Sequence, residues 1–448
     1  MANMRRLDVV YSFYPVGQGL FSRGMVIAPT GKRDPYVWVY DCGTNSKRKY
    51  LTDSLNQFAS DAPWSSAAAR HRIDLLTISH FDHDHISGMV ELLRTYRVRD
   101  LLLPYMPLWQ RLLVAALEDR GVTSQLTRFL RNPAEFVANL GDVSVERIIY
   151  VGSRNDDGGE GVPISRSPDD RPSRPSNESS NDPEEEQEDW RVTLQIGQGP
   201  TAEDEPPQHG TRTRRKSSGP KVEFLAHASA IEVGGVWEFV PYNDSELMFL
   251  VTSEFRSTVS WLTEEFLSAK TNIERETWLR YIRLAYDTQF DDTGERRNLA
   301  SLFLYAGPMG FERRAYPRRG ITFVASKYPK REFKYHIPDL RHASCSALYT
   351  GDGYMDTFAR FDKLRKYMSP RRLGSIGILQ VMHHGSRNNW FEGIGGLFAP
   401  QFSVFSSQPS RKKSHPHQEV VRDFWLYRPV QVDEGTGAYF KCPWYCFE

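Results

Sequence analysis

The chain has 448 residues, a net charge of +1, 40% hydrophobic residues and 12% aromatic residues. This length and composition exclude a wholly disordered protein and are sufficient for a sizeable hydrophobic core. The nearly balanced charge indicates neither nucleic acid nor membrane as a partner. Four cysteines in so long a chain exclude a disulfide framework. Because no run of about 18 apolar residues occurs and the first residues lack a signal-peptide pattern, we expect a cytoplasmic protein without membrane contact.

The first 153 residues combine strand and helix patterns. Alternating or continuous apolar segments predict strands at residues 7–16, 20–29, 36–41, 73–79, 100–104 and 147–151. Helical spacing of apolar side chains predicts helices at residues 47–58, 86–96, 108–118 and 124–140. We therefore expect residues 1–153 to form the first half of an α/β domain.

Residues 154–220 differ from the rest of the chain. They are rich in Ser, Pro, Gly and charged residues, with an acidic block at 184–189 and a basic block at 212–216. A segment with so few large apolar side chains cannot bury enough surface to offset the entropy lost on ordering. We predict a disordered charged insertion at 154–220, which interrupts the domain and offers a surface for a protein partner.

The last part of the chain, 221–448, returns to strand and helix patterns and is predicted to complete the domain. Strands are predicted at residues 221–226, 246–253, 301–306, 321–326, 346–350, 376–382 and 402–405. Helices are predicted at residues 354–368 and 417–425, with a helical decoration at about 255–295. Strands in both halves, with helices between them, favour an α/β layered fold.

The segment Ser79–His85 reads S-H-F-D-H-D-H and joins a buried strand to a helix. Five of its residues are histidine or aspartate, whose imidazole and carboxylate groups are ligands for Zn²⁺, Mn²⁺ and Fe²⁺. The alternative is a polar loop of solvated side chains, but unpaired acids beside a buried strand would cost free energy. The segment therefore predicts a metal-binding loop.

Six further motifs follow a family pattern in chain order. They are V-G-Q-G at 16–19, Y-D-C-G at 40–43, N-L-A-S at 298–301, Y-T-G-D at 349–352, H-H-G-S at 383–386 and H-P-H at 415–417. With the metal-binding loop, the set resembles the metallo-β-lactamase-fold hydrolase superfamily, and in particular the ComEC-type hydrolase domain of competence DNA-uptake proteins. The Asp84-His85 pair fixes the register of the loop as H-x-D-x-D-H, with Asp82 at the second-ligand position and His83 at a non-ligand position.

The resemblance implies an αββα sandwich, in which residues 1–153 and 221–448 form two facing sheets with helices outside. It also implies two bound divalent metal ions, Zn²⁺ or Mn²⁺, with the ligands His80, Asp82, Asp84, His85, Asp352 and His384. His80 and Asp82 would hold one ion, Asp84 and His85 the other, and Asp352 would bridge them. His384 is expected as the last ligand because the superfamily's final histidine precedes a glycine, and His383 is the alternative.

The same resemblance implies roles in catalysis. A hydroxide between the two ions is the implied nucleophile, and Asp84 helps to orient it while Asp352 holds both ions. Asp41 is implied to orient the metal-binding loop without binding metal; an ordinary strand-end aspartate is the alternative. The residues expected on the substrate side are His383, Ser386, His415 and His417.

One ligand of the superfamily pattern is missing. The superfamily usually supplies a histidine between the loop and the bridging aspartate, and the candidates here are His209, His227, His336 and His342. Each fits a surface or packing position better, and ComEC-type domains also lack this ligand. Three carboxylates beside three histidines make the set harder than that of a typical zinc hydrolase, so Mn²⁺ rivals Zn²⁺.

Basic residues cluster in the second half, at positions 313–314, 318–319, 327, 330–331, 334, 371–372 and 411–413. Aromatic residues at 316, 328, 333 and 335 are interleaved with the first clusters, as in grooves for single-stranded nucleic acid; a solvated surface is the alternative. The expected function is a phosphodiesterase or nuclease acting on DNA. The alternatives are a small-molecule hydrolase, acting on a cyclic nucleotide, choline-phosphate ester, thioester or lactone, and a non-catalytic interaction module.

Overall fold

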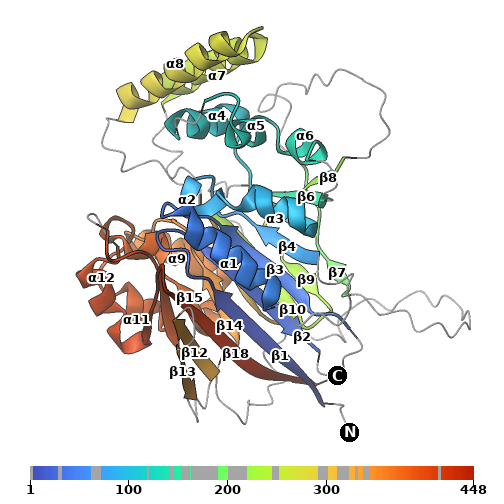
Figure 1. Cartoon of the computed structure of the whole chain (residues 1–448), viewed down its shortest axis with the longest axis vertical. Helices are drawn as coiled ribbons and strands as arrows, with labels where there is room; N and C mark the ends of the chain where they lie inside the picture. Colours follow the sequence, from blue (N-terminus) through green and yellow to red (C-terminus); the bar gives the residue numbers. More distant parts are fainter. Residues whose placement is uncertain are drawn as a thin grey trace, which may run out of the picture.

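Two large β-sheets with helices around them make the protein a mixed α/β structure (Figure 1). In this computed structural model, each sheet draws its strands from several parts of the chain. The structure describes residues 4–28, 33–61, 72–118, 121–140, 145–152, 162, 190–199, 219–244, 252–290, 301–309, 322–327, 331–336, 344–411 and 415–447.

The first sheet has ten strands in the order β13-β12-β18-β1-β2-β3-β4-β5-β6-β8. From β3 to β8 neighbouring strands are parallel, and the others pair antiparallel. Its strands are β1 (Met4–Phe13), β2 (Phe21–Ile27), β3 (Tyr36–Cys42), β4 (Arg72–Thr77), β5 (Arg97–Pro104), β6 (Val145–Val151), β8 (Lys221–Phe224), β12 (Thr322–Lys327), β13 (Arg331–His336) and β18 (Thr436–Phe447).

The second sheet has eight strands in the order β17-β16-β15-β14-β11-β10-β9-β7. The four strands from β14 to β17 are parallel, so their carboxyl ends meet at one edge. Its strands are β7 (Val192–Thr193), β9 (Ile231–Val233), β10 (Trp237–Asp244), β11 (Ser301–Pro308), β14 (Ser346–Tyr349), β15 (Ile376–Gln380), β16 (Phe402–Ser406) and β17 (Pro429–Val432).

A single core cluster contains inward-facing side chains of both sheets. Large rings meet across it, with Trp38 against Trp237 at 5.9 Å and Tyr40 stacked on Tyr349 at 4.6 Å between ring centroids. The buried Tyr40 hydroxyl donates to the Leu302 carbonyl at 2.7 Å, so burying this aromatic side chain leaves its polar group satisfied. Alternation along each strand thus builds a core between two packed sheets.

Helices cover the outer face of each sheet. On the first sheet these are α1 (Arg48–Ser60), α3 (Met89–Thr95), α5 (Gln125–Arg131) and α6 (Pro133–Ala138). On the second sheet they are α9 (Phe358–Met368), α11 (Ile394–Phe398) and α12 (Gln418–Asp423). Within the described residues, no helix combines the length and apolarity that crossing a bilayer requires.

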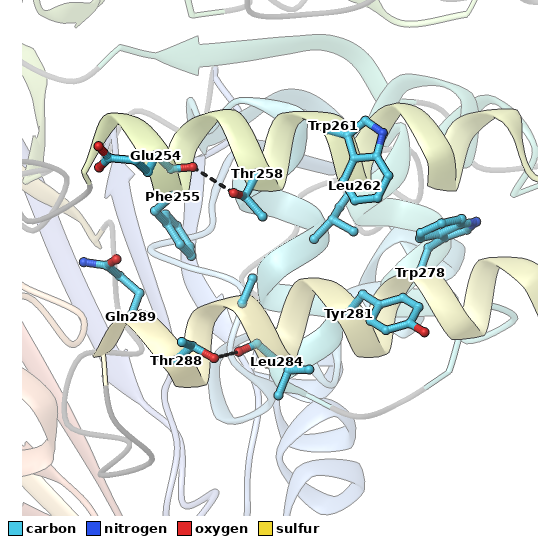
Figure 2. A pocket seen from close by; sticks show the side chains of 11 residues that line it. Glu254, Phe255, Thr258, Trp261, Leu262, Trp278, Tyr281, Leu284, Thr288 and Gln289 are labelled. Atoms are coloured by element: carbon cyan, nitrogen blue, oxygen red, sulfur yellow. Dashed lines mark hydrogen bonds between the residues drawn. The ribbon is translucent and has the colours of Figure 1, made fainter.

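A helical layer lies at one end of the molecule, beyond the first sheet (Figure 1). It consists of α4 (Leu108–Leu117), α7 (Ser253–Ser268) and α8 (Asn272–Phe290), which share a cluster of buried apolar side chains. Between α7 and α8 lies an open groove of about 610 Å³, lined by aromatic residues that include Trp261, Trp278 and Tyr281 (Figure 2). Helices α7 and α8 fall in the region predicted as a helical decoration at about 255–295, and α4 matches the helix predicted at 108–118.

The prediction of a disordered insertion at 154–220 is wrong for residues 190–199. Trp190 is 5% exposed in the core between the sheets, and its Nε1 donates to the Asp34 carbonyl at 2.7 Å. Strand β7 pairs with β9, and Val162 packs in the core outside the second sheet. The segment W-R-V-T-L-Q-I alternates apolar and polar residues, which is the strand signal that its charged surroundings concealed. The rest of the predicted insertion lies outside the described residues, apart from Val162 and residues 219–220.

Two other predictions need correction. The helix predicted at 124–140 is two helices, because Asn132 has an extended conformation and Pro133 begins α6. The second half contains strands that were not predicted, including β10, β17 and β18. The strand predicted at 246–253 lies outside the described residues except for its last two positions, and Ser253 there begins α7.

Candidate metal centre

The predicted metal-binding loop follows β4 and leads into the short helix α2 (His83–Ile86). Three of its histidine and aspartate residues are buried, with exposed fractions of 3% for His80, 7% for Asp84 and 0% for His85, whereas Asp82 and His83 are partly exposed. Asp352 and His384 follow β14 and β15, two parallel strands of the other sheet. Because parallel strands direct their carboxyl ends to one edge, the two sheets bring these loops together although Asp84 and His384 are 300 positions apart.

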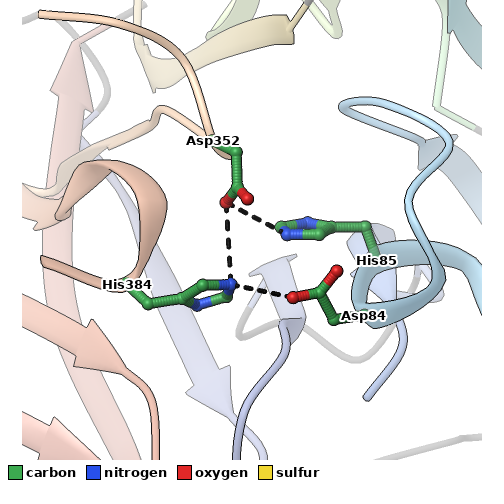
Figure 3. A group of neighbouring side chains, drawn as sticks. All are labelled: Asp84, His85, Asp352 and His384. Carbon is green, nitrogen blue, oxygen red and sulfur yellow. Dashed lines mark hydrogen bonds and ion pairs between the residues drawn. The ribbon is translucent and has the colours of Figure 1, made fainter. Parts of the chain in front are cut away.

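Four of the predicted ligands form one compact group, Asp84, His85, Asp352 and His384 (Figure 3). One ligand atom from each lies within 4.8 Å of all the others. Nε2 of His85 is 3.1 Å from Oδ1 of Asp352, and Nε2 of His384 is 3.6 Å from the same oxygen. Nε2 of His384 is also 3.2 Å from Oδ2 of Asp84. Two atoms bound about 2.1 Å from one tetrahedral ion are about 3.4 Å apart, so these spacings suit a shared metal ion.

The second carboxylate oxygen of Asp352 faces a different set of side chains. Oδ2 of Asp352 is 3.7 Å from Nε2 of His80 and 3.4 Å from Nε2 of His383. Oδ2 of Asp82 is 4.0 Å from Nε2 of His80. The His80 Nε2 atom is buried and has no hydrogen-bond partner among the described residues. A buried acceptor of this kind is costly unless a ligand or ion satisfies it, so the residues on this side also fit a metal ion.

Asp41 and Ser79 support the metal-binding loop through hydrogen bonds. Asp41 is fully buried and accepts hydrogen bonds from the Ser79 backbone at 2.7 Å, the Ser79 hydroxyl at 2.6 Å and Nδ1 of His85 at 2.7 Å. Nδ1 of His80 donates to the Ser79 hydroxyl at 2.8 Å. These bonds keep the ring hydrogens on Nδ1 and leave Nε2 of both histidines available as a ligand. Asp41 therefore supports His85, and Ser79, which the sequence analysis gave no role, supports His80.

Two glycines of the early motifs allow the backbone to approach the loop closely. The Leu20 amide donates to the Asp84 carbonyl at 3.1 Å, which ties the V-G-Q-G turn to the loop. A Cβ on Gly43 would lie 2.6 Å from backbone atoms of Asp84 and His85, and one on Gly19 would lie 2.8 Å from the Asp84 carbonyl oxygen. Any larger residue at either position would displace the loop, so these motifs shape the centre without contributing a ligand.

The loops that carry Asp352 and His384 are also held in unusual conformations. The Gln380 side-chain oxygen accepts hydrogen bonds from the amides of Thr350 and Gly351, at 2.9 and 2.8 Å. His383 and His384 have φ angles of 43° and 57°, a left-handed conformation that side chains rarely adopt. Nδ1 of His384 donates to the Ser406 carbonyl at 2.5 Å. Strained backbone held by such contacts is typical of functional sites.

The charges of the metal-free group are balanced internally. Burial disfavours the charged form of every member, but the carboxylates of Asp352 and Asp41 raise the pKa of His85 well above its usual value. The carboxylates of Asp352 and Asp84 likewise raise the pKa of His384, and the histidines hold the pKa of both aspartates below the usual range despite burial. Burial and the charge of His85 instead lower the pKa of His80 to about 3. Without metal, the neighbouring carboxylates therefore favour the protonated forms of His85 and His384, whereas His80 is neutral at neutral pH.

The residues predicted on the substrate side divide into a row of three histidines and a buried serine. The His383 and His415 rings lie 5.6 Å apart, and Nδ1 of His415 is 3.2 Å from Nδ1 of His417, so the three histidines form one row that begins beside Asp352 at His383. Ser386 is only 3% exposed, and its hydroxyl accepts the Asn388 amide at 3.2 Å. The Ser386 hydroxyl thus caps a turn, and its contact with substrate stays a prediction.

Two other sets of candidates lie elsewhere. His227 contacts the Tyr367 ring, which is a packing position; His209 and His342 lie outside the described residues, as does the side chain of His336. Among the basic clusters, Arg372 is fully buried and paired with Glu238 at 2.8 Å, so it cannot contact nucleic acid. Arg411 is exposed and donates to the Asn45 carbonyl, close to the metal-binding loop. The clusters between 313 and 334 lie outside the described residues or have undescribed side chains, and so do Lys412 and Lys413.

Comparison of the chain with protein-family models and with curated proteins finds no match. The candidate centre therefore rests on its own geometry. That geometry consists of a buried group of two aspartates and two histidines that could hold a metal ion, at the edge where two sheets meet.

Proposed function

We propose that the protein is a metal-dependent hydrolase of the metallo-β-lactamase fold, acting as a phosphodiesterase or nuclease. The observation that carries the proposal is the position of Asp352, whose Oδ1 faces His85 while its Oδ2 faces His80. A carboxylate with its two oxygens directed at different histidines is suited to bridge two ions. Bound divalent ions would lower the pKa of a water molecule and polarise a phosphoryl oxygen.

The fold supports this proposal. Two facing sheets with helices on their outer faces correspond to the αββα arrangement that the sequence motifs imply. The candidate ligands lie at one shared edge of these sheets, contributed by residues on both sides of the insertion. This is the arrangement expected if one domain runs through both halves of the chain.

The chain's own groups define what each side of the centre would do. Asp84 and His384 contact each other and would hold an ion together with His85, while Asp41 fixes the His85 ring. His415 and His417 could donate hydrogen bonds to a bound phosphodiester. Arg411, beside the metal-binding loop, adds a positive charge for a phosphate backbone, which favours DNA as the substrate.

The direct test is cleavage of labelled single-stranded and double-stranded DNA by the purified protein with Mn²⁺ or Zn²⁺. We expect cleavage by the natural protein and none by Asp352→Ala at equal concentration and fold content. A panel with a cyclic nucleotide, a choline-phosphate ester, a thioester and a lactone distinguishes the alternatives. Hydrolysis of one of these without DNA cleavage would select a small-molecule hydrolase, and no turnover with retained metal would favour an interaction module.

A further inference from the structure

Four histidines around Asp352 share one hydrogen-bonding arrangement. In each, Nδ1 donates to a fixed acceptor, so that Nε2 of the neutral ring carries the lone pair a metal ion needs. The four pairs are His80 with Ser79 Oγ at 2.8 Å, His85 with Asp41 Oδ2 at 2.7 Å, His384 with Ser406 O at 2.5 Å, and His383 with Asn389 Oδ1 at 2.7 Å. The Nδ1 atom of His383 is therefore bound to an acceptor in the same way as in the three histidines already considered as ligands.

The free nitrogen of His383 is directed at the same oxygen as that of His80. Nε2 of His383 is 3.4 Å from Oδ2 of Asp352, and Nε2 of His80 is 3.7 Å from it. These separations are close to the value of about 3.4 Å expected for two ligands of one tetrahedral ion. The neighbouring histidines differ, because Nδ1 of His415 and Nδ1 of His417 face each other at 3.2 Å.

The backbone and Asn389 fix His383 relative to Asp352. The His383 amide donates to the Gly351 carbonyl at 2.9 Å, and its φ angle of 43° is held in the left-handed region. Asn389 is fully buried, and its side-chain amide donates to the Asp352 carbonyl at 2.9 Å while its oxygen accepts from His383. One side chain thus positions both the carboxylate loop and the imidazole, as supporting residues of metal sites do.

We propose that His383 is a ligand of the second metal ion, together with His80, Asp82 and Asp352. It would supply the further histidine ligand that the superfamily takes from between the metal-binding loop and Asp352, in place of the candidates in that stretch. This inference rests on the proposed function, since it assumes that the centre binds two ions. It replaces a substrate contact by His383 with a structural role in the centre.

The test measures Co²⁺ binding to the full-length protein by competition with a chelator and by metal analysis. We expect the natural protein to bind two Co²⁺ ions, and His383→Ala to keep one while its affinity for the other falls at least about tenfold. His417→Ala is the matched control, because this histidine lies in the same row but does not face Asp352. Circular dichroism checks that each variant folds.

His383→Cys gives a readout that a structural role would not produce. A thiolate at this position should add a sulfur-to-cobalt charge-transfer absorption, whereas His417→Cys should not. If the natural protein binds two ions but His383→Ala binds both with unchanged affinity and His383→Cys shows no such absorption, the inference is wrong and the proposed function still stands. If the natural protein binds no Co²⁺, Mn²⁺ or Zn²⁺, both fail.

Discussion

Asp41 offers the sharpest test of how the centre is supported, because it accepts a hydrogen bond from His85 while lying outside the group that could hold metal. Asp41→Asn preserves shape but replaces one carboxylate oxygen with an amide nitrogen, which donates instead of accepting. That nitrogen would face either the Ser79 amide, or both the Ser79 hydroxyl and Nδ1 of His85. In the second orientation the His85 ring would turn, or carry its hydrogen on Nε2, which blocks the metal.

The size of the effect follows from these contacts. Removing the partner that orients a metal-binding histidine typically weakens metal affinity 10- to 100-fold, or about 1.4 to 2.7 kcal/mol. Loss of charge-assisted hydrogen bonds should also lower the free energy of unfolding by about 1.5–3 kcal/mol. We expect both effects in Asp41→Asn.

Chelator competition with Zn²⁺ and Mn²⁺ measures the affinity, and urea unfolding of the metal-free protein measures stability. Asp74→Asn is the matched control, since Asp74 is 3% exposed on β4 and accepts the Val37 amide at 2.9 Å, away from the centre. It should lose stability without losing metal affinity. Metal affinity at the natural level in Asp41→Asn would refute the idea that Asp41 orients His85.

Three other predictions concern the aspartate proposed to bridge the ions, the pH dependence of metal affinity and the buried tryptophan within the predicted insertion. Asp352→Ala should abolish metal binding and turnover with an unchanged circular dichroism spectrum; normal rates would contradict the assignment. Because the pKa values of His85 and His384 are raised, the protonated rings must lose a proton to bind metal, so affinity in chelator titrations should keep rising as the pH passes the usual histidine value of 6.5, and a flat profile would argue against these ligands. Trp190→Ala should lower the free energy of unfolding by about 3–5 kcal/mol in urea with metal affinity unchanged, whereas a loss below about 1 kcal/mol would show that Trp190 is not a core residue.

The sequence predicted best where local pattern and burial coincide. Strands β3 and β4 are mostly apolar and buried, because helices cover one face and the second sheet covers the other. Strand β10 escaped prediction because Pro241 interrupts its pattern, although the strand pairs with β11 on one side and β9 on the other. Trp190 escaped because the composition of its neighbours outweighed a short alternating segment.

The residues of the candidate centre also divide into those with a local sequence signal and those without one. His80, Asp84 and His85 could be selected from the sequence because ligand-type side chains follow a buried strand at close spacing. Asn389 could not, since its bonds to His383 and Asp352 exist only after β14 and β15 lie side by side. Supporting residues of this kind are defined by tertiary packing, and their types carry no local signal.

The placement of the centre couples its formation to the packing of the two sheets. Asp84 and His85 follow a strand of the first sheet, whereas Asp352 and His384 follow strands of the second, so no ligand group exists until the core between the sheets has formed. In the metal-free state, opposite charges on these residues offset part of the repulsion between buried carboxylates. A metal ion that binds only the assembled group would stabilise the folded protein by mass action, by about 2.7 kcal/mol at a concentration of 100 times its Kd. Metal binding and the docking of the two halves are therefore one equilibrium, which explains why the ligands can be distributed on both sides of a long insertion.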